Sequence, residues 1–283
     1  MTAGPAPAAL TVAVLGLGEA GGTIARDLVA AGARVRGYDP AVPAPPGVTA
    51  ATSDADACQG AGLVLSLTTA GEAEKALDQA LPGLGGAGAG GAGGLSGAGA
   101  REAAGGRTVY ADANTASAGL KQRLAAIAER AGVPFADIAI MAPVPGRGLG
   151  TPMVVSGPAS ETVARLLGGC GATVSVLPGP AGAAATRKLL RSVFYKGMAA
   201  AAIEALRAAR AAGSEDWLRE HIAAELAAAD EGTLARLEQG SHRHARRREH
   251  EMAAAGDLLD ELSVPPRVTR ASQLWLKELA TEG

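Results

Sequence analysis

Aromatic side chains are scarce in this chain: Phe, Trp and Tyr together make up 2% of its 283 residues. Proteins that bind single-stranded nucleic acid stack successive bases on aromatic rings, and this sequence offers few of them. Charge of one sign is also lacking, because the formal net charge is only −2. No overall positive field is therefore available to attract nucleic acid, and we expect no nucleic-acid partner.

Cysteines and long apolar runs are also few. The two cysteines, Cys58 and Cys170, stand alone in the sequence and fit neither a disulfide framework nor a metal-binding cluster. No apolar run is long enough to span a membrane. The first ten residues lack the charged region and apolar core of a secretory signal. These features predict a reduced, cytoplasmic protein with neither a membrane partner nor a metal ion.

The first half of the chain alternates strand-like and helical patterns, as parallel α/β sheets do. An apolar strand at 11–15 leads into GLGEAG at 16–21, then a helical pattern at 23–31, a strand at 34–38 and Asp39. Strand, G-x-G-x-x-G, helix, strand and acid in this order are the dinucleotide-binding fingerprint.

Each glycine of the fingerprint has a physical role. Gly16 permits a tight turn, Gly18 lets a pyrophosphate approach the backbone, and Gly21 lets the helix pack closely on the strand. The N–H groups at the helix start then face the anion. The predicted cofactor-binding loop is Gly16, Leu17, Gly18, Glu19, Ala20 and Gly21.

Asp39 bears on the choice between NAD and NADP. A carboxylate at the end of the second strand accepts hydrogen bonds from the ribose of NAD and repels the 2′-phosphate of NADP. The sequence therefore favours NAD. Two alternatives stay open: Arg34 or Arg36 folds round to the phosphate, or Asp39 is simply a turn residue before Pro40.

Polar residues also follow the next predicted strands, at 63–67 and 108–111. Because the carboxyl ends of parallel strands meet at the ligand-binding edge of such sheets, we expect Thr68, Thr69 and Asn114 on the nicotinamide side. Helix capping is the alternative role for such residues, and it is the role we expect for Ser117.

The remaining patterns complete an expected two-domain chain. Residues 83–106 are mostly glycine and alanine, which predicts a flexible surface loop. A long helix follows Pro180, and the last third is helical throughout, including a pattern over 216–237. We expect an α/β fold with a Rossmann-type domain at 1–179 and an all-α substrate and dimerisation domain at 180–283.

Four stretches resemble the 3-hydroxyacid dehydrogenase superfamily, which includes 6-phosphogluconate dehydrogenase and the imine reductases. They are GLGEAG, DANTAS at 112–117, DIAIMAPVPG at 137–146 and GPAGAAATRK at 179–188. Two further stretches, KxxRSxxxKG from Lys188 and RHAxRRxxEM from Arg243, resemble a less characterised, 6-phosphogluconate dehydrogenase-like branch.

The resemblance implies roles for individual residues. Lys188 matches the family's general acid/base, although a solvated surface charge is its alternative role. The substrate-binding element corresponds to Pro143, Val144, Pro145 and Gly146, with Pro145 where the family has a serine. Arg191 and Ser192 replace the paired asparagines that follow the family lysine. Further substrate-binding residues are then expected to be Arg191, Ser192, Lys196, His244 and Arg247, the last two reaching the cleft from this chain or a partner subunit.

These observations predict an NAD(P)-dependent oxidoreductase. It would transfer hydride between the nicotinamide and a small polar or anionic alcohol or carbonyl compound, with a lysine as acid/base. An imine reductase-type activity and a non-catalytic dinucleotide sensor are the alternatives. The helical domain predicts a homodimer, because such an Ala/Leu-rich domain usually buries its apolar face against a second copy.

Overall fold

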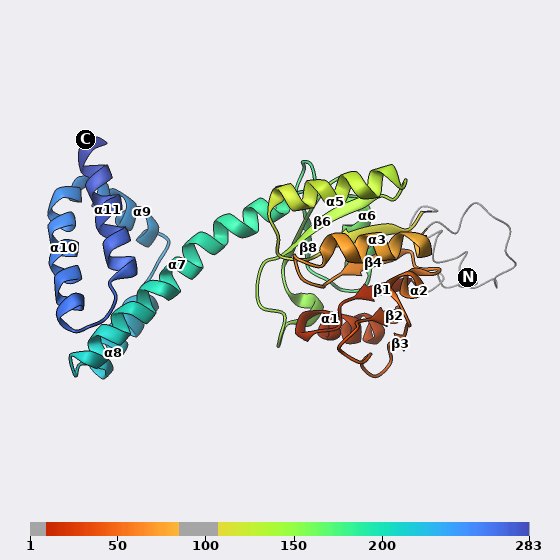
Figure 1. Cartoon of the computed structure of the whole chain (residues 1–283), viewed down its shortest axis with the longest axis horizontal. Coiled ribbons are helices and arrows are strands. Elements are labelled where there is room, and N and C mark those ends of the chain that lie inside the picture. Colours follow the sequence, from red (N-terminus) through yellow and green to blue (C-terminus); the bar gives the residue numbers. More distant parts are fainter. Residues whose placement is uncertain (1–9, 85–106, 283) are drawn as a thin grey trace, which may run out of the picture. The chain divides into compact units, whose positions relative to one another are not determined.

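The computed structural model describes residues 10–84 and 107–282 (Figure 1). The chain divides into two compact units, Met1–Leu190 and Arg191–Gly283. Residues 180–190, which the sequence assigned to the helical domain, thus belong to the first unit, where Ala181, Ala184 and Ala185 are buried. The first nine residues and most of the predicted Gly/Ala loop, from 85 to 106, lie outside the described residues; 83 and 84 end a helix.

An eight-stranded sheet forms the first unit, in the order β3-β2-β1-β4-β5-β6-β7-β8. The strands from β3 to β6 pair in parallel, β7 runs antiparallel to β6, and β8 is parallel to β7. Their bounds are β1 Thr11–Leu15, β2 Arg34–Tyr38, β3 Thr49–Ala50, β4 Leu63–Ser66, β5 Val109–Asp112, β6 Phe135–Ile140, β7 Met153–Ser156 and β8 Val174–Val176.

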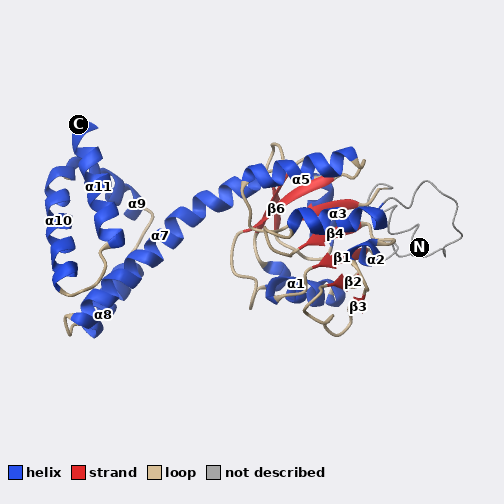
Figure 2. Cartoon of the chain, in the orientation of Figure 1, coloured by secondary structure: helices blue, strands red, loops and turns tan. Residues whose placement is uncertain are grey.

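Helices cover both faces of this sheet (Figure 2). They are α1 Glu19–Ala30, α2 Asp54–Cys58, α3 Ala73–Leu84, α5 Ala118–Arg130 and α6 Ser160–Gly169. Side chains of β1 alternate between two apolar clusters: Val12 and Val14 pack with α1 and α6, whereas Ala13 and Leu15 pack with α2, α3 and α5. Because both faces are covered, the strands read as continuous apolar runs.

The second unit is helical. Helix α7 (Ala183–Ala211) starts in the first unit and continues past Leu190 into the second, followed by α8 Glu215–Ala227, α9 Thr233–Arg243, α10 Ala245–Glu261 and α11 Arg267–Glu282. The Glu204 carboxylate accepts the N–H groups of Val268 and Thr269, each at 2.8 Å, and so fixes the start of α11. None of the helices in the described part of the chain has the length and apolar character needed to cross a bilayer.

The structure confirms the predicted α/β class with a Rossmann-type sheet and a helical C-terminal part. One helix expected over 216–237 is instead two, because Asp230 and Thr233 exchange hydrogen bonds of 2.9 Å and end the pattern. Aspartate and glycine favour caps over helix interiors, and Gly232 is the N-cap of α9. The short β3 and α2, missed from sequence, are too brief to give a periodic signal.

Candidate functional site

A groove of about 310 Å³ lies at the carboxyl ends of β1, β2 and β4. Its walls include Gly16 after β1, Asp39 after β2, and Thr68 and Thr69 after β4. The chain leaves β1 for β2 on one side and reaches β4 on the other side, so this is the point where the strand order reverses. Ligands of open α/β sheets bind at that point.

The glycine turn beside the groove has the geometry that its three glycines predict. Gly16 has φ +88°, a conformation that favours glycine, and a Cβ there would lie 2.5 Å from the Leu67 carbonyl oxygen. A Cβ at Gly21 would collide with the Gly16 carbonyl oxygen. A Cβ at Gly18 would meet no described atom within 4 Å, so the backbone there is open to an approaching group.

The start of α1 adds an electrostatic feature to this turn. The first N–H groups of a helix lack intrahelical acceptors and carry partial positive charge. Gly18 is the N-cap of α1, and no side chain of the described residues caps it. Glu19, exposed in the first turn, and Ala20 follow directly. The backbone at Gly18, Glu19 and Ala20 is therefore suited to an anionic group.

Asp39 connects the glycine turn with the end of β2. Its carboxylate accepts the N–H of Leu17 at 2.8 Å, of Ala41 at 2.8 Å and of Val42 at 3.0 Å. Burial raises the pKa of the Asp39 carboxyl, but the three N–H groups outweigh this effect and hold the pKa below its ordinary value. A carboxylate has about four acceptor sites, so three bonds leave room for one more donor.

The contacts of Asp39 and of the two nearby arginines bear on its expected role. Its bonds to Ala41 and Val42 make it a turn residue as well as a wall of the groove. Arg36 instead donates to the Asp56 carboxylate at 2.5 Å and to the Asp56 carbonyl at 2.8 Å. Arg34 and Arg36 line a different groove, with Thr11 at the amino end of β1.

Asn114 lies on the neighbouring part of the sheet edge and is buried. Its amide group donates to Asp112 Oδ1 at 2.6 Å, and to the hydroxyls of Ser66 and Thr68, each at 3.2 Å. Its carbonyl oxygen is buried and has no hydrogen-bond partner among the described residues. Buried polar atoms are normally satisfied, so this oxygen is a candidate acceptor for a ligand.

Lys188 lies on the second turn of α7, in the first unit, and is half-buried. The stretch 143–146 forms the loop after β6, with Pro143, Pro145 and Gly146 exposed. The Val144 side chain is 4% exposed and packs in the core with Leu149. Only the backbone of Val144 is left to face a ligand.

The chain matches a family model in its second unit and has the fold of several solved structures. Residues 209–279 match the family described as domain of unknown function DUF1932. No curated protein matches the sequence. Among solved structures, an imine reductase from Streptomyces aurantiacus is 17% identical with a TM-score of 0.75, covering 96% of this chain and 95% of that chain. A reductive aminase from Aspergillus terreus, in complex with NADPH and ethyl levulinate, is 18% identical with a TM-score of 0.73, covering 97% and 95%.

A third solved structure connects the fold to a superfamily. The conserved protein MTH1747, of unknown function, is 27% identical with a TM-score of 0.55, covering 96% of this chain and 98% of that chain. Its structure is described as similar to 3-hydroxyacid dehydrogenases. The chain has the 3-hydroxyacid dehydrogenase-like fold. This confirms the resemblance inferred from the four sequence stretches.

The remaining predicted substrate residues belong to the second unit of this 3-hydroxyacid dehydrogenase-like chain. Ser192 and Lys196 lie on α7, and the Arg191 guanidinium stacks 4.1 Å above the Tyr195 ring. His244 separates α9 from α10, and the exposed Arg247 lies 3.6 Å from Glu251. Their role toward a substrate stays a prediction.

A charged cluster that sequence reasoning missed lies next to Asn114. Lys121, Asp112 and Asp137 are all fully buried, and Lys121 forms ion pairs with both carboxylates. Burial raises the pKa of the Asp112 carboxyl, although Lys121 and Asn114 oppose the shift. One feature of the sequence could have indicated this cluster: Asp137 is an acid in the middle of the otherwise apolar strand FADIAI, where a buried carboxylate needs a partner.

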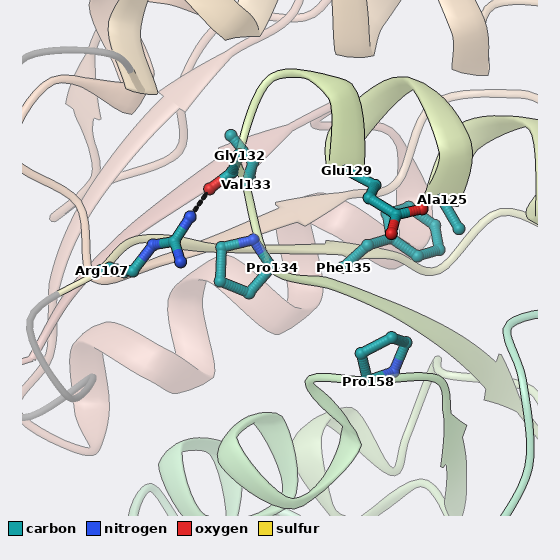
Figure 3. Close-up of a pocket in the computed structure, with 8 residues that line it drawn as sticks. All are labelled: Arg107, Ala125, Glu129, Gly132, Val133, Pro134, Phe135 and Pro158. Carbon is teal, nitrogen blue, oxygen red and sulfur yellow. Dashed lines mark hydrogen bonds between the residues drawn. The ribbon is translucent and has the colours of Figure 1, made fainter.

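Another groove of about 430 Å³ lies where β5 and β6 begin, at their amino ends (Figure 3). Val133, Pro134, Phe135 and Pro158 give it an apolar lining. Its arginine, Arg107, donates to the Gly132 carbonyl (Figure 3). Ligands of doubly wound sheets bind at the opposite, carboxyl edge, which makes the groove beside the glycine turn the candidate site.

Proposed function

We propose that this chain is an NAD(P)-dependent oxidoreductase that acts on a small polar or anionic carbonyl or alcohol compound. The observation that carries the proposal is the glycine turn at the strand-order reversal, open at Gly18 and followed by an uncapped helix start. A nicotinamide dinucleotide fits this arrangement, because it needs an anion site for its pyrophosphate and an acceptor for its ribose. The solved imine reductase and reductive aminase of the same fold support the reaction class.

Each part of the groove would hold a different part of the cofactor. Gly16, Leu17, Gly18, Glu19, Ala20 and Gly21 form the pyrophosphate turn, and Asp39 accepts from the adenosine ribose through its remaining acceptor site. Thr68 and Thr69, which line the groove, would lie toward the nicotinamide. Asn114, whose amide donates to the Thr68 hydroxyl, would lie on the same side and accept an N–H with its unpartnered oxygen. The bound cofactor supplies or accepts the hydride.

The chain itself would move the proton. Lys188 would give a proton to the carbonyl oxygen or imine nitrogen during reduction, and take it back from the alcohol during oxidation. Desolvation and neighbouring cations can tune a lysine to this task. Pro143, Pro145, Gly146 and the backbone of Val144 would then position the substrate, with Arg191, Ser192, Lys196, His244 and Arg247 as further anion-recognising candidates.

The charges that line the groove support a preference for NAD over NADP as part of this proposal. Three carboxylates line it, from Asp39, Asp54 and Glu72, against the single ammonium of Lys75 among the described lining residues. A 2′-phosphate would be repelled there, so we expect a KM for NADH roughly tenfold below that for NADPH, equivalent to about 1.4 kcal/mol. Initial rates, followed by the absorbance of the reduced nicotinamide, measure both values. A lower KM for NADPH would contradict this prediction.

The same assay tests the proposed reaction. Hydroxyacids are offered with NAD, oxoacids and ketones with NADH, and ketone–amine mixtures with NADH to detect imine reduction. Turnover of the hydroxyacids or oxoacids supports the dehydrogenase assignment. Turnover only with added amine favours the imine reductase alternative, which the fold of the Streptomyces aurantiacus enzyme supports. Cofactor binding without turnover across the whole panel would leave the sensor alternative.

The proposed partner is a second copy of the chain. The proposed location is the cytoplasm. Large apolar side chains of the second unit are exposed, among them Trp217 at 65%, Leu274 at 67% and Trp275 at 66%. Exposed apolar patches commonly mark protein interfaces. Sedimentation equilibrium at micromolar concentration is expected to give about twice the chain mass of 27.8 kDa. The chain mass itself, unchanged at tenfold higher concentration, would contradict the homodimer.

A further inference from the structure

Lys121 occupies a position where lysine is rarely found. Its side chain is fully buried, and it lies in the first turn of α5. Lysine is almost never fully buried unless it is paired, and a cation near a helix N-terminus is disfavoured by the helix dipole. Such a residue needs specific partners to be kept there.

Two strands supply these partners. Lys121 Nζ donates to Asp112 Oδ2 at 2.5 Å and to the Asp112 carbonyl oxygen at 2.8 Å, and it lies 2.9 Å from Asp137 Oδ1. Asp112 ends β5 and stands opposite Asp137 in the register with β6. The ammonium therefore holds both carboxylates in fixed positions on the same face of the sheet.

The other oxygen of Asp137 reaches the start of α7. Asp137 Oδ2 accepts the N–H groups of Gly182 at 3.1 Å and Ala185 at 3.0 Å, while Ser156 Oγ accepts the N–H of Ala184 at 3.0 Å. These are the N–H groups that a helix cannot satisfy by itself, and a carboxylate there is favoured by the dipole. Asp137 thus caps α7 from the neighbouring strand β6.

The same cluster reaches the groove through Asn114. The amide of Asn114 donates to Asp112 Oδ1 and to the hydroxyl of Thr68, which lines the groove. A continuous polar chain therefore runs from Thr68 to the first turn of α7. Lys188 follows on the next turn of that helix.

We propose that Lys121 is a positioning residue that fixes Asp137, and through it the start of α7, so that Lys188 is held in one orientation toward the nicotinamide edge. The inference rests on the proposed acid/base role of Lys188. A buried ion pair commonly adds little net stability compared with apolar packing, and fixing one conformation is its best-supported use. The contacts of Asp137 identify α7 as the element whose conformation is fixed.

Hydrogen exchange tests the structural half of the proposal on the full chain without any cofactor. In Lys121→Met, the amides of Gly182, Ala184 and Ala185 are expected to exchange roughly tenfold faster than in the unaltered chain. The amides of Val12 and Val14 in β1 should keep their rates. Unchanged exchange at the start of α7, or an equal rise in β1, would overturn the proposal.

Kinetics test the functional half, with the substrate that gives most turnover in the panel above. In Lys121→Met, kcat is expected to fall roughly tenfold while the KM for NADH rises by clearly less, because the cluster touches the groove on the nicotinamide side, through Asn114 and Thr68, and not through the glycine turn or Asp39. Lys277→Met, at an exposed position on α11, is the matched control and should change neither value. An unchanged kcat, or a parallel loss of cofactor binding, would overturn the positioning role.

A variant that fails to fold and a chain without turnover can each be distinguished from failure of the positioning role. If Lys121→Met does not fold, we use the double variant Lys121→Met/Asp112→Asn, which removes one negative charge together with the positive one. Hydrogen exchange and kinetics are then measured on this variant and judged by the same criteria. If the unaltered chain turns over none of the compounds, the proposed function is contradicted independently of the role of Lys121. The exchange rates at Gly182, Ala184 and Ala185 still decide whether Lys121 fixes the start of α7.

Discussion

Replacing Lys188 by alanine is expected to lower kcat at least roughly a hundredfold, because general acid–base catalysis by a positioned side chain contributes about 10²–10⁴-fold. The affinity for NADH should stay within about twofold, since the cofactor groove is built from the ends of β1, β2 and β4. Steady-state kinetics with the best substrate of the panel, together with a fluorescence titration of NADH, measure both quantities.

Lys277→Ala is the matched control for this experiment. Lys277 is an exposed lysine on α11, so its loss removes one positive charge of the same kind without altering the groove. Undiminished turnover in folded Lys188→Ala would exclude Lys188 as the acid/base and return it to the role of a surface charge. Loss of NADH binding in the same variant would instead place Lys188 in the cofactor site.

Gly21→Ala, in the glycine turn, is expected to have the second large effect, on both stability and NADH binding. In Gly21→Ala the new Cβ would collide with the Gly16 carbonyl oxygen, which is backbone and cannot move aside cheaply. Overpacking of this kind costs about 3 kcal/mol, so we expect a lower free energy of unfolding and no measurable binding of NADH. Urea denaturation and the NADH titration report the two losses separately.

Gly18→Ala separates stability from binding at the same turn. No described atom lies within 4 Å of the added Cβ, and Gly18 has φ −59°, which alanine tolerates. The free energy of unfolding should change by only about 0.5 kcal/mol, yet NADH affinity should fall roughly tenfold or more if a pyrophosphate approaches this backbone. Full NADH affinity in Gly18→Ala would mean that the anion lies elsewhere.

The parts of the site that sequence predicts are the local ones. Turn geometry at Gly16, close packing at Gly21 and the acid at Asp39 follow from a fingerprint within one β-α-β unit. The structure has each of these features, including the positive φ at Gly16. Ser117 also caps α5, accepting the Leu120 N–H at 3.2 Å, because capping depends on neighbours three residues away.

The features of the site that the sequence does not predict depend on contacts between residues far apart in the chain. Asp112 and Asp137 are neighbours because β5 and β6 pair in one particular register, and Lys121 reaches both carboxylates from α5. The family resemblance implies a substrate role for Val144, and the sequence does not show that its side chain packs in the core that α1 and α6 cover. The unpartnered oxygen of Asn114 is likewise visible only when its three amide contacts and its burial are known together.

The central claim is that the groove beside Gly18 and Asp39 binds a nicotinamide dinucleotide, and the thermal stability of the full chain titrated with NADH and NADPH tests it most directly. A ligand that binds only the folded state adds about 2.7 kcal/mol of stability at a hundredfold excess over Kd. We predict a rise in Tm that saturates at lower NADH than NADPH concentration. No rise with either dinucleotide at millimolar concentration would contradict the claim.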